Sequence, residues 1–430
     1  MSIKSNWKKC KLKDLVKINS SSVSKKDNLE HIVYLDTGNI TMGKIEELAE
    51  FAYSEAPSRA KRKVKENSIV YSMVRPNQRH YGLIKNPTTN LIVSTGFAVL
   101  DAKEFADSKY IYYWLTQNHI TDLLQSIAEN STSAYPAIRP VDLENLDISL
   151  PPLEEQKRIA EILGSLDDKI ELLQKQNKTL EDMAKALFKS WFVDFDVVRA
   201  KQKGLPKADI MREYHLTDEL YDLFPSSFAD SPLGPIPSGW EVKTIQDLGE
   251  VVCGKTPSTS HKEYYGGSVP FITIPDMHNS IFANKTERYL TSQGEQAQPT
   301  KTLPPFSVCV SCIATPGLVT MTTANSQTNQ QINSVIPHNL EAKFYNYYVL
   351  RSVADQIRAQ GSGGSVFVNL NKTAFSKIKV LWADQSLQKL FTKESESYFN
   401  KILNNLKQIQ TLTELRDTLL PRLISGKIRV

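Results

Sequence analysis

The sequence predicts an α+β protein built from two tandem copies of one structural unit. Two tandem globular domains, each a mixed β-sheet with helices, are expected to be separated by two long helices that form an antiparallel coiled-coil spacer. Three observations lead to this prediction. Short β-like runs such as SIVYSMV alternate with turns and helical patches. Similar segments recur at a fixed offset along the chain. A long helical pattern closes each of the two copies.

The repeat is visible in three places. Trp240 opens GWEVKTIQDL and stands 233 residues after Trp7, which opens NWKKCKLKDL. NSTSAYPAIRPVDLENLDISLP aligns with SGGSVFVNLNKTAFSKIKVLW, and LEDMAKALFKS aligns with LTELRDTLLPR. A constant offset of this kind indicates two copies of one structural unit rather than two unrelated domains.

Heptad spacing predicts that the two long helices pack on each other. In the first helix, leucine or isoleucine recurs every seven residues, and Ile162 and Met183 are expected to fill the companion position three residues later, with polar residues at Lys169 and Gln176. The second helix departs from a strict heptad around Leu412, which predicts a stammer. The expected seam residues are Ile159, Leu166, Leu173, Leu180 and Leu187 in the first helix, and Phe399, Ile402, Leu406, Ile409, Leu415 and Leu419 in the second.

These patterns divide the chain into five segments. A Pro- and Ser-rich stretch, FPSSFADSPLGPIPSG, indicates a connector between the two halves. The expected segments are a first globular domain at 1–152, a first long helix at 153–200, a connector at 201–239, a second globular domain at 240–383 and a second long helix at 384–430.

Composition excludes several classes of protein. The chain has 430 residues with 40% hydrophobic and 23% charged residues, so it can bury real cores. It has no apolar run long enough for a membrane span and no apolar signal segment at its start, which together predict a cytoplasmic protein. The net charge of +5 permits nucleic-acid binding without requiring it.

The four cysteines predict neither disulfides nor a metal site. Cys309 and Cys312 form a C-x-x-C, but the run FSVCVSCIA alternates like a buried strand, which points residues i and i+3 to opposite faces. No second pair completes a zinc site, so a structural role is expected and no metal is predicted.

The stretch GEVVCGKT, from Gly249 to Thr256, matches the P-loop pattern letter for letter. A P-loop needs a strand before it and a helix that begins at the lysine. Here Pro257 and the glycine-broken stretch STSHKEYYGGS follow instead. ATP binding by this chain is therefore not expected, although the pattern keeps a nucleotide-binding protein as a remote alternative.

The chain resembles the specificity (S) subunit of Type I restriction–modification systems. The stretches similar to that family are LPPLEEQKRIAEILGSLDDKIELL, LFKSWFVDFDVVRAK, LGPIPSGWEV and LTELRDTLLPRLISGKIRV, with GKTPS, EYYGGSVPFITIPDM and TNQQINSVIP inside the second domain. The resemblance covers nearly the whole chain and is strongest over the two helical regions. The first domain departs from the pattern, because it opens with SNWKKC rather than PSGWEV.

The resemblance implies a non-catalytic subunit that binds a bipartite double-stranded DNA target, one half with each domain. It implies that the helices set the gap between the halves and dock two methyltransferase (modification) subunits, through which restriction subunits join. It also implies no cofactor in this chain, because S-adenosylmethionine, ATP and magnesium are used by the partners. The chain carries no N-P-P-[YF], H-E-x-x-H or G-x-S-x-G motif of its own.

Candidate DNA contacts follow from the chemistry of recognition. Arginine can pair bidentately with guanine and asparagine or glutamine with adenine, while lysine supplies contacts to phosphate. In the first domain the candidates are Arg59, Lys61, Arg62, Lys63, Arg75, Asn77, Gln78, Arg79 and Tyr81. In the second domain they are Lys255, Ser258, His261, Lys262, Tyr264, His278, Asn279, Asn325 and Gln327. Solvated charge on an ordinary surface remains the competing interpretation of the lysine runs. A coiled-coil scaffold that binds only protein remains the main alternative function.

Overall fold

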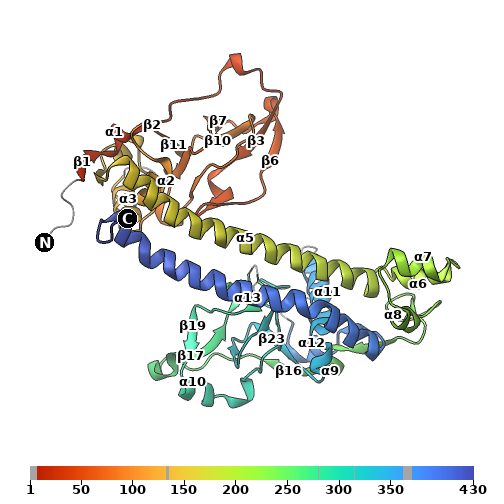
Figure 1. Cartoon of the computed structure of the whole chain (residues 1–430). Helices are drawn as coiled ribbons and strands as arrows, with labels where there is room; N and C mark the ends of the chain where they lie inside the picture. The colour runs from red at the N-terminus through yellow and green to blue at the C-terminus, as the bar shows by residue number, and fades with distance from the viewer. Residues whose placement is uncertain (1–6, 132–134, 279, 314, 362–369) are drawn as a thin grey trace. The chain divides into compact units, whose positions relative to one another are not determined.

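The computed structural model describes residues 7–131, 135–278, 280–313, 315–361 and 370–430. The chain divides into two compact units (Figure 1). Unit 1 consists of Met1–Glu171 with Gln410–Val430, and unit 2 consists of Leu172–Ile409. Each unit therefore contains one globular domain and a part of both long helices.

The globular part of unit 1 is built on two four-stranded sheets. The sheet with the order β2-β11-β8-β9 is antiparallel throughout. The sheet with the order β6-β3-β10-β7 is mixed, because β3 and β10 pair in parallel and its other two pairings are antiparallel. A separate antiparallel pair joins β1 to β12. The strands are β1 (Lys8–Lys11), β2 (Val16–Ile18), β3 (His31–Leu35), β6 (Ala49–Ala52), β7 (Ala60–Lys63), β8 (Ile69–Ser72), β9 (Tyr81–Leu83), β10 (Leu91–Ser94), β11 (Phe97–Ala102) and β12 (Asp147–Leu150), with a small hairpin of β4 (Ile40–Thr41) and β5 (Lys44–Ile45).

Apolar strands and an aromatic helix form the core of unit 1. Strands β8 and β10 are buried on both faces, as their runs IVYS and LIVS predict. Helix α2 (Ser108–Leu115) begins where the Asp107 carboxylate accepts a hydrogen bond from the Tyr110 amide, and it buries most of the run SKYIYYWL. The remaining helices of the domain are α1 (Leu12–Leu15), α3 (Asn118–Glu129) and α4 (Pro140–Glu144).

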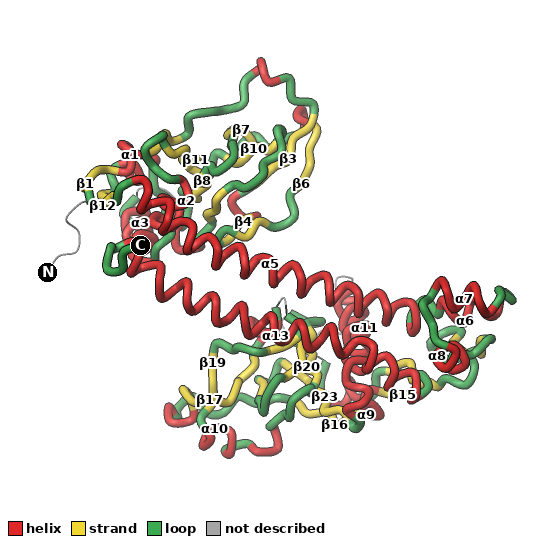
Figure 2. The backbone as a smooth tube through the Cα atoms, viewed as in Figure 1, coloured by secondary structure: helices red, strands yellow, loops and turns green. Residues whose placement is uncertain are grey.

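Unit 2 repeats this plan. Its sheets have the orders β16-β23-β20-β21-β18 and β19-β17-β22, and β15 pairs with β24 as β1 pairs with β12. The strands are β15 (Glu241–Thr244), β16 (Gly249–Cys253), β17 (Tyr265–Ile272), β18 (Phe282–Ala283), β19 (Arg288–Leu290), β20 (Val308–Ser311), β21 (Val319–Thr322), β22 (Gln327–Thr328), β23 (Ile332–Pro337) and β24 (Lys379–Trp382). The helices are α9 (Ile245–Leu248), α10 (Ser292–Gln296), α11 (Lys343–Gly361) and α12 (Lys372–Ser376). The predicted repeat is confirmed (Figure 2).

The two long helices are α5 (Leu153–Phe192) and α13 (Gln385–Ile424). Positions of α5 with the spacing four, three, four, three are all buried or half-buried, and they are Ile159, Leu163, Leu166, Ile170, Leu173, Asn177, Leu180, Ala184 and Leu187. Every predicted seam residue of this helix therefore faces inward. Of the two predicted companions, Met183 is wrong because it is 46% exposed, whereas Ile162 is half-buried and packs against the core of unit 1. The second inward-facing position of each heptad lies four residues after the seam residue. Its one polar occupant is Asn177, whereas Lys169 and Gln176 are exposed.

Helix α13 keeps the same spacing without the predicted stammer. Phe399 and Ile402 are buried, and Leu406, Ile409 and Leu419 are half-buried, as predicted. Leu415 is the exception, since it is 44% exposed and the inward position next to it belongs to Arg416. The sequence pattern went wrong here because an arginine occupies a seam position and an adjacent leucine faces solvent.

The two helices are antiparallel within each unit. In unit 1, Leu423 and Ile424 pack in one core with Ile159 and Leu163, and Arg416 forms an ion pair with Asp167 further along α5. In unit 2, Asn405 hydrogen-bonds to Asn177, whereas Phe391 at the start of that part of α13 contacts Phe192, at the end of α5. In both units, moving forward along one helix means moving backward along the other.

A tryptophan packs at the C-terminal end of each long helix. In unit 1, α13 is followed by Gly426 in the left-handed region at φ +71, and a Cβ there would come 3.2 Å from the Trp7 ring. In unit 2, α5 is followed by Phe195 at φ +56, whose ring contacts Trp240 at 5.9 Å between centroids. Each tryptophan opens one copy of the repeat and packs on the helix that ends the other copy.

The connector contains more structure than its composition suggests. Helices α6 (Asp196–Gln202), α7 (Lys207–Glu213) and α8 (Asp218–Leu223) precede a two-stranded pair, β13 (Phe228–Ala229) and β14 (Ile236–Pro237). The Lys201 ammonium lies 3.7 Å from the centre of the Tyr221 ring and donates to two carbonyl oxygens at the end of α8. These contacts hold α6 and α8 together within unit 2.

Candidate nucleic-acid interface

The turn between β8 and β9 carries most of the predicted base-reading side chains of unit 1. Pro76–Gln78 form a single 3-10 turn, and Arg75 and Arg79 flank it with left-handed backbones at φ +48 and +56. Non-glycine residues adopt this conformation at a cost in free energy. Two arginines keep this conformation on either side of a proline. Their side chains, and not a low backbone free energy, therefore account for the choice of residues in this turn.

Surrounding residues fix the backbone of this turn. The Arg75 amide donates to the Pro136 carbonyl oxygen at 2.9 Å, and the Asn77 amide donates to Oε1 of Gln125, on α3, at 3.1 Å. Pro76 is buried beneath the turn. The backbone is therefore positioned before any ligand arrives.

The side chains of the turn face solvent. Arg75, Asn77 and Gln78 are exposed and Arg79 is half-buried. The Arg75 guanidinium lies 5.2 Å from the centre of the Tyr135 ring, which favours one orientation of the side chain. Guanidinium and amide groups on a fixed turn can make paired hydrogen bonds with base edges.

Tyr81 is not available to DNA, contrary to the prediction. Its ring is 4% exposed and stacks on Tyr71 with 5.5 Å between the ring centroids. It belongs to β9, where the inward-facing positions fill the core. We expected the whole stretch RPNQRHYG to form a loop, but its last two residues, Tyr81 and Gly82, belong to β9.

The basic run at β7 is only partly free. Arg59 and Lys61 are exposed, and Lys61 lies 5.8 Å from the centre of the Tyr53 ring. Burial lowers the pKa of Arg62, whose Nε has no hydrogen-bond partner among the described residues.

Lys63 is committed to a protein contact. Its ammonium is hydrogen-bonded and ion-paired to Asp27, and this bond, with the Ser24 amide, lowers the pKa of that carboxyl to about 2. Arg59, Lys61 and Arg62 are therefore better placed than Lys63 to meet a phosphate.

In unit 2 the candidates lie mainly on the segment between β16 and β17. Lys255, Ser258, His261 and Lys262 are exposed and Tyr264 is half-buried. The His261 and Tyr264 rings stack with 4.8 Å between their centroids. His261 also contacts the Glu263 carboxylate at 2.8 Å, which places an acidic group beside these candidate residues.

The remaining candidates of unit 2 divide into surface and core. His278 and Asn325 are exposed, whereas Asn279 lies outside the described residues. Gln327 is fully buried, and its amide donates to the carbonyl oxygens of Glu295 and Gln298 and to the Thr302 hydroxyl. The prediction of Gln327 as a DNA contact is wrong, because this network uses its amide to hold β22 in place.

The loop of unit 2 that corresponds to the β8–β9 turn of unit 1 has different side chains. It joins β20 to β21 and includes Cys312, Thr315, Pro316 and Gly317. The Arg358 guanidinium donates to the Gly317 carbonyl oxygen, which ties this turn to α11. Among its described residues the turn offers no arginine, asparagine or glutamine, so the two units do not present the same recognition turn.

The P-loop match is not a phosphate site. Gly249–Cys253 form strand β16, and the amides of Gly254 and Lys255 donate to the carbonyl oxygens of Ile332 and Thr328. Amides that are already bonded cannot cradle phosphate. The helical segment next along the described chain is the three-residue turn Lys262–Tyr264, so no helix begins at Lys255 as a P-loop requires.

The C-x-x-C pair is structural, as predicted. Cys309 is buried in β20, where it accepts a hydrogen bond from the Ser334 hydroxyl, and Cys312 is buried at the end of that strand. Burial raises the pKa of Cys309 to about 12 and that of Cys312 to about 11. Over the described parts of the chain, no group of three or more His, Cys, Asp or Glu side chains could hold a metal ion.

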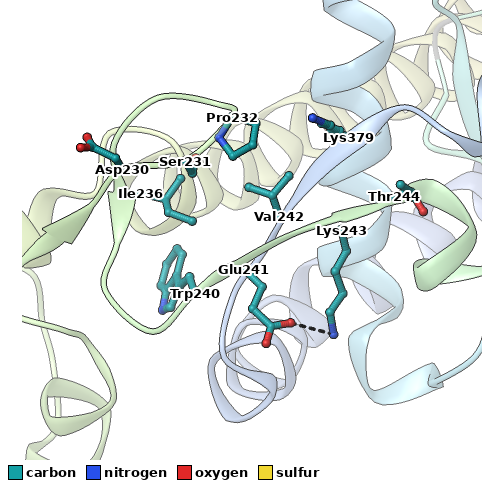
Figure 3. Close-up of a pocket in the computed structure, with 10 residues that line it drawn as sticks. All are labelled: Asp230, Ser231, Pro232, Ile236, Trp240, Glu241, Val242, Lys243, Thr244 and Lys379. Atoms are coloured by element: carbon teal, nitrogen blue, oxygen red, sulfur yellow. Dashed lines mark ion pairs between the residues drawn. The ribbon is translucent and has the colours of Figure 1, made fainter.

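A pocket of about 450 Å³ lies between the connector and β15 in unit 2 (Figure 3). Two of its four charged residues pair with each other. Glu241 and Lys243 form an ion pair at 3.1 Å, and the Lys243 ammonium lies 4.2 Å from the centre of the Trp382 ring. The pocket therefore offers packing and a surface ion pair rather than a set of reactive groups.

Comparison with known proteins identifies the family. The model of the Type I restriction modification DNA specificity domain matches residues 4–182 and 237–413, one match in each copy of the repeat. The chain belongs to this family. Family membership also accounts for the two mixed domains and the two long helices.

Relatives of known name agree with this assignment over the full length. The chain is 36% identical to the Type I restriction enzyme HindI specificity subunit of Haemophilus influenzae, over 99% of this chain and 100% of that protein. It is 25% identical to the MjaIX specificity subunit of Methanocaldococcus jannaschii, over 82% of this chain and 75% of that protein. The chain is therefore the specificity subunit of a Type I system and not one of its catalytic subunits.

A solved structure supports the fold. The crystal structure of the Type I restriction-modification system S subunit from M. genitalium superposes with a TM-score of 0.58, at 16% identity, over 97% of this chain and 96% of that one. Across the described residues, no helix has both the length and the apolar character needed to cross a bilayer.

Proposed function

We propose that this specificity subunit reads a bipartite double-stranded DNA target, one block with each unit, and that it docks modification subunits on its two long helices. The observation that carries this proposal is the complete repetition of a mixed-sheet domain in a family of DNA specificity domains. Two domains within one chain can present two recognition surfaces at a fixed spacing, as the two subunits of a symmetric dimer do.

Unit 1 supports the proposal through its β8–β9 turn. Arg75, Asn77, Gln78 and Arg79 combine the groups that read guanine and adenine, on a backbone that Gln125 and Pro136 hold in place. Arg59, Lys61 and Arg62 supply phosphate contacts, which position a protein on DNA without reading sequence. Lys63 and Tyr81 are left out because the fold engages them.

Unit 2 is proposed to read through other segments. The exposed side chains of Lys255, Ser258, His261 and Lys262 precede β17, and His278 and Asn325 lie on loops of the same unit. Its β20–β21 turn lacks the base-reading groups of unit 1 among the described residues. We therefore expect two half-sites of different sequence rather than a palindrome.

The exposed faces of the long helices are proposed to bind the modification subunits. Leu172 and Met183 on α5 and Leu415 on α13 are 44% to 48% exposed, so these helices offer apolar side chains to a partner. Two modification subunits and, through them, restriction subunits would complete the assembly. S-adenosylmethionine, ATP and magnesium would be used by those partners and not by this chain. Because its ligand is DNA, we expect the complex in the cytoplasm.

Binding-site selection from random duplex DNA tests the function. The chain would be copurified with the modification subunit of its own system, and enriched sequences would be read out. Two short blocks separated by a constant unspecified gap would support the proposal. A stable, methyl-donor-competent complex that enriches no sequence would contradict it and would favour a coiled-coil scaffold.

A further inference from the structure

A second turn lies against the β8–β9 turn in unit 1. Strands β4 and β5 form a hairpin whose two-residue tip is Met42–Gly43, with φ values of +48 and +81. Positive φ at both tip positions is the mark of a type I′ turn, for which asparagine followed by glycine is strongly preferred. Methionine is a poor choice for the first position, because its Cβ crowds the backbone there.

The tip is fixed directly beside Arg79. The Met42 amide donates to the Arg79 carbonyl oxygen at 2.9 Å, and the Gly43 amide donates to the Tyr81 carbonyl oxygen at 2.8 Å. A Cβ at Gly43 would come 2.8 Å from the Tyr112 hydroxyl, so the hairpin is pressed onto the domain. The position of Met42 relative to the arginine turn is therefore determined by the fold.

The choice of residues at positive φ separates this surface from the rest of unit 1. At most of its non-glycine positions with positive φ the unit uses asparagine, at Asn19, Asn28, Asn67 and Asn86. Among the described non-glycine residues of unit 1, the other three at positive φ are Met42, Arg75 and Arg79. All three belong to these two adjoining turns, where a side chain has been kept at the expense of the backbone.

The Met42 side chain is turned toward solvent. It is 54% exposed and belongs to none of the hydrophobic clusters formed by the described residues. Methionine raises the backbone free energy at this φ, and its side chain gains no packing within the domain. A contact with another molecule would explain why methionine is present. The neighbouring guanidinium and amide groups are suited to the major groove, where thymine presents the apolar C5-methyl group.

We infer that Met42 contacts the methyl group of a thymine in the DNA block read by unit 1, and so acts as a specificity-determining residue. This inference rests on the proposed function, because it requires that unit 1 reads DNA. It adds an apolar contact to a surface whose other groups form hydrogen bonds, so the block should contain a thymine that hydrogen bonding alone does not select.

The test uses the complex with the modification subunit and the site selected by the wild-type complex. Each thymine of the unit 1 block would be replaced in turn by uracil, which lacks the methyl group, and binding would be measured for the wild-type chain and for Met42→Asn. Wild type should lose about fivefold or more in affinity at one thymine, at the lower end of the usual cost of a wrong base pair. Met42→Asn should bind the thymine and uracil sites equally and keep its preference in the second block.

Two controls keep the result interpretable. Met42→Asn and Met42→Gly both suit a type I′ turn, so both should melt at or above the wild-type temperature. Phe105→Gln removes an equally exposed apolar side chain (54%) elsewhere in unit 1 and should leave thymine discrimination unchanged.

The outcomes separate this inference from the proposed function. If the wild-type complex selects two blocks but uracil has no effect at any position, or if Met42→Asn discriminates as the wild type does, Met42 does not read thymine although the chain reads DNA. If the wild-type complex selects no block for unit 1, the proposed function fails for that unit and the inference fails with it.

Discussion

The side-chain amide of Asn405 donates to Oδ1 of Asn177 at 2.8 Å, which joins the two long helices within unit 2 through a polar pair at seam positions. Asn405 is fully buried, and its neighbours along the seam are apolar. A single polar pair in an apolar seam lowers stability but penalises other registers, in which one amide would face hydrocarbon. This pair is therefore a natural candidate for fixing the helix register.

Replacement of Asn405 by leucine should show this coupling. Asn405→Leu deprives Asn177 of its donor, and we expect a loss of about 1 kcal/mol in the free energy of unfolding. The double variant Asn177→Leu with Asn405→Leu should recover the loss or exceed wild type, because both polar groups are removed together. Urea unfolding of all four forms measures the coupling, with Asn404→Leu on the exposed face as control. Additive single effects would show that the pair does not act as a unit.

Asp167 should matter more to unit 1 than its neighbour Asp168. The Asp167 carboxylate accepts hydrogen bonds from the Tyr113 hydroxyl at 2.6 Å and from Arg416 at 2.8 Å, and its side chain is 28% exposed. Asp168 pairs with Lys85 but is 59% exposed. We expect Asp167→Asn to cost about 1–3 kcal/mol and Asp168→Asn less than about 0.5 kcal/mol. Thermal unfolding at low and high salt would compare them, and equal losses would contradict the assignment.

The Asp27–Lys63 pair should show itself at acid pH. Hydrogen bonding to Lys63 and to the Ser24 amide lowers the pKa of Asp27 to about 2 in the folded chain, against about 3.9 when unfolded. The lowered value means that the pair adds stability above pH of about 4, and that this stability is lost as the pH falls toward 2. NMR titration of the Asp27 carboxyl should give a midpoint near 2 in wild type and a higher one in Lys63→Met. An unchanged midpoint would mean that Lys63 does not stabilise the carboxylate.

Arg75 and Arg79 should affect one half of the DNA target only. Each is expected to contribute about 1–3 kcal/mol to discrimination at one base position, which corresponds to about five- to 150-fold in affinity. Arg75→Ala and Arg79→Ala should therefore weaken selection in the block read by unit 1 and leave the other block intact. Arg139→Ala, an exposed arginine of the same unit that pairs with Asp142, serves as the control. Equal loss in both blocks would contradict separate reading by the two units.

Lengthening both helices should change the gap between the two blocks. Seven residues inserted between Glu171 and Leu172, and seven between Ile409 and Gln410, preserve the seam and add about 10 Å, close to three base pairs. Binding-site selection should then return the same blocks with a longer gap. Seven residues added after Leu233 in the exposed connector should leave the gap unchanged. An unchanged gap after the helix insertions would rule out the spacer role.

The sequence predicted the architecture better than the details, for identifiable reasons. Repetition and heptad spacing are properties of residue type, so the two domains and their helices could be read directly. The position of Arg416 could not be, because charge alone does not reveal that the Asp167 carboxylate will neutralise an arginine in the seam. Leu415, one position away, fits an apolar pattern equally well and yet faces solvent.

The recognition surface was predictable only in part. Arg75 and Arg79 stand out because turn-forming and base-reading residues occur together there. Tyr81 and Gln327 have suitable chemistry, but strand pairing turns them inward. The β4–β5 hairpin was missed because strands of two residues have no periodicity, and the only local signal is Gly43 after an unlikely methionine.

The contact between Trp7 and the segment that follows α13 has a consequence for synthesis. Ile428 and Val430 pack, with Trp7, against the core that contains Leu12 and Ile159. The ribosome makes the globular part of unit 1 before unit 2, whereas the residues of α13 and the segment after it that cover this core are made after unit 2. A nascent chain that has not yet reached α13 would therefore expose the apolar core of unit 1 while unit 2 is synthesised.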